Sequence, residues 1–65
     1  MWTVIYIAKN KKAAERVQEL LSQEGMLAKI QPVNKGSDRE DGYFEVLVPE
    51  GEAEDAQNII YESGL

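Results

Sequence analysis

The sequence predicts an α+β domain whose elements follow in the order strand, helix, strand, strand, helix. Three observations lead to this fold class. Short segments rich in aromatic and β-branched residues are too brief for helices and read as strands. Two longer segments carry apolar residues at three- and four-residue spacing, as amphipathic helices do, and glycine and proline separate the segments. With 65 residues, the chain has room for one domain, 1–65.

The first half of the chain contains a strand and a helix. Residues 2–8 form the expected strand, which is apolar on both faces. Asn10 is expected to cap the helix, because its side chain can accept a hydrogen bond from a free amide of the first turn. The helix is expected over 11–24, and Gly25 ends it with the left-handed turn that glycine adopts without strain. The apolar stripe of this helix consists of Ala13, Ala14, Val17, Leu20 and Leu21.

The second half contains two strands and a helix. Residues 26–33 are expected to form a strand that ends near Pro32, since proline lacks the amide proton that a central strand needs. Residues 33–42 are polar and contain glycine, so a long hairpin loop is expected there. A third strand is expected over 43–48 and a second helix over 52–63. Acidic residues at the start of this helix suit the positive end of its dipole.

The two halves of the chain repeat one another. Leu20-Leu21 followed by Gly25-Met26 corresponds to Ile59-Ile60 followed by Gly64-Leu65. A full duplication of this kind gives the ferredoxin-like β-α-β-β-α-β plan, and the chain looks like that plan with its fourth strand missing. We expect a three-stranded sheet of order 1-3-2 with two helices on one face. From the preference for right-handed crossovers, we expect strands 1 and 3 to be parallel.

The chain also resembles a known family. The residues that carry the match are Glu15, Leu20, Leu21, Glu24, Gly25 and the run Val46-Leu47-Val48-Pro49-Glu50 followed by Ala53-Glu54-Asp55-Ala56. Their pattern is similar to that of small bacterial signal-transducing proteins, which are related in fold to the PII-like, ferredoxin-like regulators. The resemblance covers nearly the whole chain, and it implies the same fold and a regulatory role. It implies no active site, and the chain lacks the long loops with which PII proteins bind nucleotides.

The composition disfavours most chemistry. The chain has 12 acidic and 7 basic residues, a net charge of −5, no histidine and no cysteine. Catalysis would therefore lack an imidazole base and a thiolate nucleophile, and the negative charge disfavours nucleic acid. No apolar run is long enough to span a bilayer, and no basic leader opens the chain. We expect a cytoplasmic, non-enzymatic protein without a cofactor, a bound metal, a nucleic-acid partner or a membrane partner.

The first candidate site is the sheet face that the helices leave open. If Ile5 and Ile7 point to the helices, that face is lined by Trp2, Val4, Tyr6, Tyr43 and Leu47. One interpretation is a half-solvated sheet surface. The other is a protein interface, where tryptophan and tyrosine are enriched as anchors. We expect a homodimer or a partner protein, bound either on this face or along strand 1, whose long apolar edge would aggregate if left uncovered.

The second candidate site is the lysine-rich start of the first helix. Lys9, Lys11 and Lys12 oppose the helix dipole, so local stability does not explain them. One interpretation is a site that binds a small anionic metabolite, built from these lysines, Asn10 and the free amides of the first turn. The other is electrostatic pairing with the acidic residues that begin the second helix, if the two helices run parallel.

A third segment, Asp38-Arg39-Glu40-Asp41, offers carboxylates to a divalent cation. It lacks the ligand spacing of a calcium-binding loop. We expect a solvated loop there and no metal site.

Overall fold

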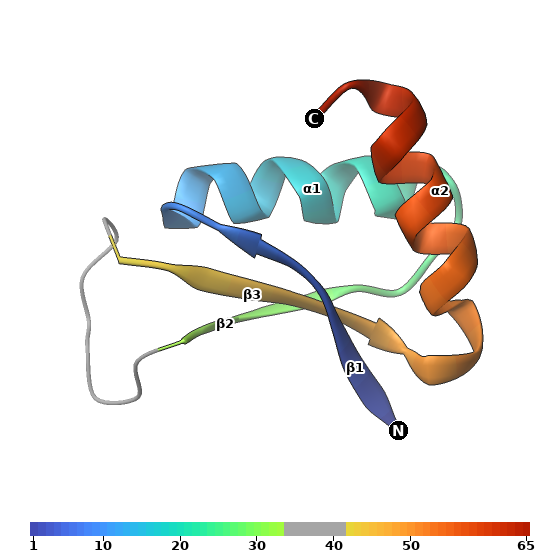
Figure 1. Ribbon diagram of the computed structural model, residues 1–65, viewed down its shortest axis with the longest axis horizontal. Coiled ribbons are helices and arrows are strands. Elements are labelled where there is room, and N and C mark those ends of the chain that lie inside the picture. Colours follow the sequence, from blue (N-terminus) through green and yellow to red (C-terminus); the bar gives the residue numbers. More distant parts are fainter. Residues whose placement is uncertain (34–41) are drawn as a thin grey trace.

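The computed structural model describes residues 1–33 and 42–65. Its elements are β1 (Trp2–Ala8), α1 (Lys11–Gln23), β2 (Lys29–Pro32), β3 (Phe44–Pro49), a 3₁₀ turn (Glu50–Glu52) and α2 (Ala53–Ser63). The predicted order of strand, helix, strand, strand, helix is confirmed (Figure 1). Most of the loop predicted over 33–42 lies outside the described residues, as does the cation candidate at 38–41.

Local sequence signals set both ends of α1. The Asn10 Oδ1 accepts a hydrogen bond of 2.7 Å from the Ala13 amide, which confirms the predicted cap. At the other end Gly25 has a φ of +82°, and the Met26 amide donates to the Leu21 carbonyl over 2.9 Å. This is the backbone pattern of a Schellman turn. Gly64 has a φ of +83° after α2, so the two helices end alike, as the repeat predicts.

The sheet has the order β1-β3-β2, and β3 is antiparallel to both of its neighbours. The predicted order is confirmed, whereas the prediction that β1 and β3 are parallel is wrong. The crossover through α1 joins β1 to β2, and these two strands run in the same direction with β3 inserted between them in the opposite direction. The preference for a right-handed crossover concerns that pair and not β1 with β3. In the part of the chain that the structure describes, β1 pairs with β3 alone and forms one edge of the sheet.

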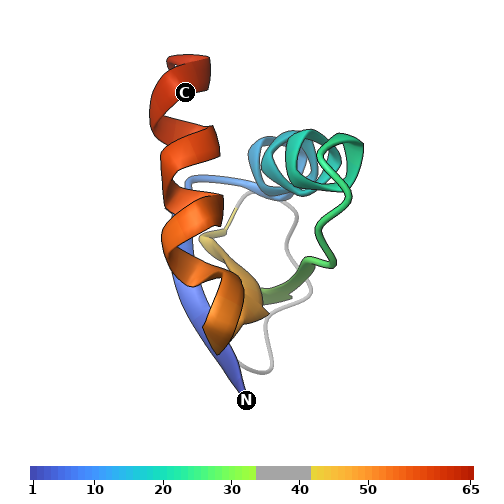
Figure 2. The ribbon, with the colours of Figure 1, turned by 90° about the vertical axis from the view of Figure 1, so that its right-hand side faces the viewer.

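Both helices cover the same face of the sheet, as predicted (Figure 2). The core lies between them and the sheet. Its buried residues are Ala8, Ala14, Val17, Leu21, Phe44, Val46, Val48, Ala56 and Ile60. Within 1–33 and 42–65, neither helix has the length and apolar content needed to cross a bilayer.

The second strand is shorter than predicted, because it begins at Lys29 and not at residue 26. Residues 26–28 instead connect the end of α1 to the sheet. Met26 and Ala28 pack against the core, and the Gln18 side chain donates a hydrogen bond of 2.9 Å to the Ala28 carbonyl. The apolar residues of this segment therefore belong to a connection that packs partly against the core, and their alternation resembles that of a strand.

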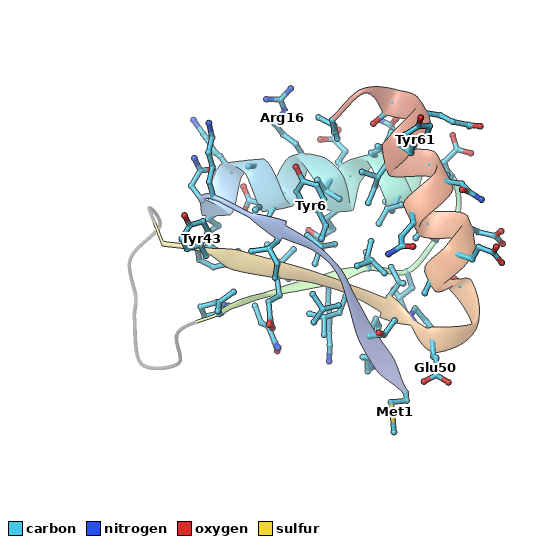
Figure 3. The ribbon with its side chains drawn as sticks, in the orientation of Figure 1. Met1, Tyr6, Arg16, Tyr43, Glu50 and Tyr61 are labelled. Carbon is cyan, nitrogen blue, oxygen red and sulfur yellow. The ribbon has the colours of Figure 1, made fainter. Side chains whose placement is uncertain are left out.

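The two helices cross steeply and do not run parallel (Figures 1 and 2). α1 follows the end of β1, and α2 follows the end of β3. Because these strands are antiparallel, the two helices begin at opposite ends of the sheet. Figure 3 places Glu50 at the end where β1 starts, far from the start of α1. The predicted pairing of the lysines with Glu50, Glu52 and Glu54 is therefore wrong.

Candidate interaction surface

The face of the sheet that the helices leave open carries the first candidate site. Directly opposite residues of an antiparallel pair share a face, so the strand register assigns the residues of this face. Leu47 of the central strand lies between Val4 of β1 and Lys29 of β2. A second row consists of Ile7, Glu45 and Gln31. Trp2 lies on the same face as Val4, two residues before it.

The margin of this face along β1 is apolar and exposed. Trp2, Val4 and Ile7 have 37%, 41% and 51% of their surface exposed, and we call these three residues the β1 stripe. Single apolar residues on a surface are ordinary. Neighbouring ones along one strand form a continuous patch, which is typical of a contact surface.

The margin along β2 is polar. Lys29 and Gln31 are exposed, and the Gln31 side-chain amide donates a hydrogen bond of 2.8 Å to the Glu45 carboxylate. The open face is therefore divided lengthwise into an apolar half beside β1 and a polar half beside β2.

The centre of the open face is covered by side chains of the protein itself. The Lys29 Nζ lies 4.5 Å from the centre of the Trp2 ring, a distance typical of a cation–π interaction. These residues belong to strands on opposite sides of β3, so their side chains meet above β3. Leu47 of β3 is only 7% exposed, although no helix covers this face. Leu47 has Val4 and Lys29 directly opposite it, so side chains of the two flanking strands, the Trp2–Lys29 pair among them, cover it.

A β-bulge in β1 changes which residues reach the open face. The register passes from Val4 opposite Leu47 to Tyr6 opposite Val46, so Ile5 is an extra residue. A bulge of one residue reverses the alternation of the residues after it. Tyr6 therefore shares the face of the buried Val46 and packs against the core on the helix side (Figure 3).

The sequence-based assignment of faces within β1 is accordingly corrected. Tyr6 was expected on the open face and lies on the helix side, whereas Ile7 was expected to face the helices and lies on the open face. Trp2, Val4 and Leu47 do share the open face. Tyr43 directly precedes β3 and is 65% exposed, and its carbonyl accepts a hydrogen bond of 3.0 Å from the Val33 amide.

Four residues of this surface were not in the predicted site: Ile7, Lys29, Gln31 and Glu45. For Ile7 the sequence holds no signal, because β1 is uncharged and mostly apolar and its alternation cannot show a bulge. For Lys29 a signal exists. Lys29 alternates along the strand with residues that face the core, so it lies on the open face, within reach of an aromatic ring there.

The two edges of the sheet differ in their protection against pairing with another strand. β2 carries Lys29 and Pro32, a charge and a proline of the kind that keep edge strands from pairing. β1 has neither charge nor proline over its seven residues. The edge of β1 is thus the one chemically suited to accept a further strand.

The second candidate site lies at the start of α1. Lys9, Lys11 and Lys12 flank the cap residue Asn10, with Lys9 and Lys12 exposed and Lys11 half-buried. The Asn10 side chain already accepts a hydrogen bond from the Ala13 amide. One of the first-turn amides expected to bind an anion therefore has a partner within the protein.

Two shallow grooves flank α1. One, of about 260 Å³, is lined by Arg16, Glu19, Leu20, Gln23, Ser63 and Leu65. The other, of about 410 Å³, lies between α1 and the connection to β2. The Ser63 hydroxyl, which lines the first groove, donates a hydrogen bond of 2.6 Å to the Ile60 carbonyl in the last turn of α2. Among residues 1–33 and 42–65, no group of three or more acidic residues is arranged to hold a metal ion.

No family model matches the chain, and neither a curated protein nor a solved structure matches it. What is shown is a small α+β domain of β-α-β-β-α order with a ferredoxin-like arrangement of its strands and helices.

Proposed function

We propose that this chain is a small non-enzymatic interaction module of regulatory type, which self-associates through its sheet. The observation that carries the proposal is the exposed β1 stripe, Trp2, Val4 and Ile7, on a strand whose outer edge no strand of the described residues covers. Exposed apolar surface next to unpaired backbone groups is costly to leave in water and favours association.

The partner proposed is a second copy of the chain. The net charge is −5, so two copies repel one another wherever their charged surfaces meet. β1 is the strand that contains no charged residue, and contact there avoids both repulsion and the burial of unpaired charge. Contact through β2 is disfavoured for the same reason, because Lys29 of one copy would lie close to Lys29 of the other.

A non-enzymatic role agrees with the chemistry of the chain. There is no histidine and no cysteine, so the serines that line the shallow grooves beside α1, Ser22 and Ser63, have no imidazole base. The regulatory part of the proposal rests on the resemblance of the Leu20 to Gly25 and Val46 to Ala56 segments to the bacterial signal-transducing family.

The alternative proposal is a sensor that binds a small anionic metabolite at Lys9, Asn10, Lys11 and Lys12. These residues adjoin one another at the start of α1, with Asn10 as its cap. We favour self-association, because the Asn10 cap occupies the Ala13 amide that an anion would use, while nothing in the described chain occupies the β1 edge.

Sedimentation equilibrium over a series of concentrations tests the proposal. The wild-type chain is expected to shift from monomer to dimer as its concentration rises into the high micromolar range. Val4→Lys places a charge in the β1 stripe and is expected to stay monomeric. Its far-ultraviolet circular dichroism should match that of the wild type, because the Val4 side chain lies outside the core.

Gln31→Lys is the matched control, since it adds the same side chain to the same face at the β2 margin. It is expected to dimerise like the wild type. A wild-type chain that remains monomeric at every concentration would contradict the proposal, and so would equal association of the two variants.

A further inference from the structure

The backbone of β1 is oriented so that particular residues face the free edge of the sheet. The Glu50 amide donates a hydrogen bond of 2.7 Å to the Met1 carbonyl, so Met1 directs its carbonyl toward the β3 side. Along an antiparallel ladder the residues that exchange hydrogen bonds alternate. Thr3, opposite Val48, therefore also turns its amide and carbonyl toward β3. Trp2 and Val4 turn theirs toward the free edge.

From this geometry we infer that a second copy adds its β1 antiparallel to the first, with Thr3 opposite Thr3 and Trp2 opposite Val4. This inference rests on the proposed self-association and specifies how it occurs. In this register the amides and carbonyls of Trp2 and Val4 bond across the interface, while those of Thr3 keep their bonds to β3. The pairing uses residues before the bulge at Ile5, where the ladder is regular.

The side chains support the same register. An antiparallel edge-to-edge pair continues the sheet, so the open faces of both copies lie on one side. Trp2 of one copy then lies directly opposite Val4 of the other, twice by symmetry. An aromatic residue opposite a β-branched residue is a favourable cross-strand pair. The Lys29 ammonium already contacts the Trp2 ring, and any restriction of the ring by this contact reduces the side-chain freedom lost on association.

The alternative contact, in which two open faces stack on each other, is disfavoured by the composition of that face. Stacking would bury Lys29, Gln31 and Glu45, two of them charged. It would gain little at the centre, because Leu47 is already shielded. Edge pairing leaves the polar half in water. In Figures 1 and 2 the amino end of β1 extends clear of both helices, so a second strand has access to it.

The interface is small, since three residues of each strand face one another. Small interfaces are typical of weak and transient complexes. Dimers formed in this way are expected to dissociate on dilution, which makes concentration the variable of choice for a test.

Amide hydrogen exchange of the wild-type chain, measured by NMR at several concentrations, provides that test. The Val4 amide points to the free edge and is bonded only in the dimer, so its exchange should slow with concentration. The slowing should reach roughly tenfold when about nine-tenths of the chains are paired, because exchange then proceeds from the unpaired fraction. The internal control is the Lys12 amide, which lies in the first turn of α1 and outside the proposed contact, so its exchange should not change with concentration.

Sedimentation on the same samples shows whether a negative result contradicts edge pairing alone or self-association as well. A dimer whose Val4 amide exchanges at the monomer rate would overturn edge pairing and leave self-association standing. A chain that stays monomeric at every concentration would overturn both. If dimerisation slowed amide exchange on α1 but not at Val4, the contact between copies would lie at α1, and pairing through β1 would be wrong.

Discussion

Single side chains decide where the first helix begins and what the open face presents. Asn10 was predicted as a cap from its type and position, and the hydrogen bond to Ala13 bears this out. A cap is a local feature, which the sequence alone can predict. The cover over Leu47 includes the pair of Trp2 and Lys29, which are 27 positions apart in the sequence, and local pattern does not predict it.

The Asn10 cap gives a prediction at the residue scale. Asn10→Ala leaves the Ala13 amide without its partner and is expected to lower the free energy of unfolding by about 1 kcal/mol. Asn10→Ser keeps a side-chain acceptor and should stay close to the wild type. Urea unfolding followed by circular dichroism measures both variants. Equal stability of the alanine and serine variants would show that the cap contributes nothing.

Among the elements, both helices, β1 and β3 were predicted to within one residue, and β2 was not. α1 ends one residue before the predicted boundary, and β1 spans the residues expected. β2 is shorter than expected, because Met26 and Ala28 pack against the core from a connection and not from a strand. The bulge at Ile5 could not be predicted, since every residue of β1 is compatible with either face. That one residue accounts for the wrong placement of both Tyr6 and Ile7.

The turn that ends α1 gives a prediction at the scale of the element. Gly25 has a φ of +82°, and a side chain added there would meet no atom within 4 Å. Gly25→Ala should therefore cost about 1 to 2 kcal/mol from backbone strain alone. The measurement is the shift in the midpoint of urea unfolding.

Gly51→Ala is the matched control for this turn. Gly51 also has open space around an added side chain, but its backbone is not left-handed. Its effect should stay within about 0.5 kcal/mol. If Gly51→Ala destabilised the protein as much as Gly25→Ala, left-handed strain would not be the reason for the glycine at position 25.

For the whole molecule, the strand order was predicted and the strand directions were not. The order followed from the half-repeat, which relates Gly25 to Gly64. The error in direction came from applying the crossover preference to β1 and β3, although the helix crossover joins β1 to β2. Antiparallel pairing also separates the starts of the two helices. It thereby leaves the lysines around Asn10 without the acidic partners expected for them.

In the whole molecule, the edge of the sheet formed by β1 combines several properties that favour a strand-to-strand contact. Within residues 1–33 and 42–65, β1 has β3 as its one neighbouring strand; β1 also carries no charge and presents the β1 stripe on the open face. The proposal that a second copy completes the sheet rests on these properties together. None of them alone would suffice, because isolated exposed apolar residues are common.

An isotope-filtered nuclear Overhauser experiment on an equal mixture of labelled and unlabelled chains, at a concentration where dimers form, tests this arrangement. Edge pairing through β1 predicts contacts between protons of Trp2 on one chain and Val4 on the other. Intermolecular contacts confined to the helices or to the β2 margin would contradict it.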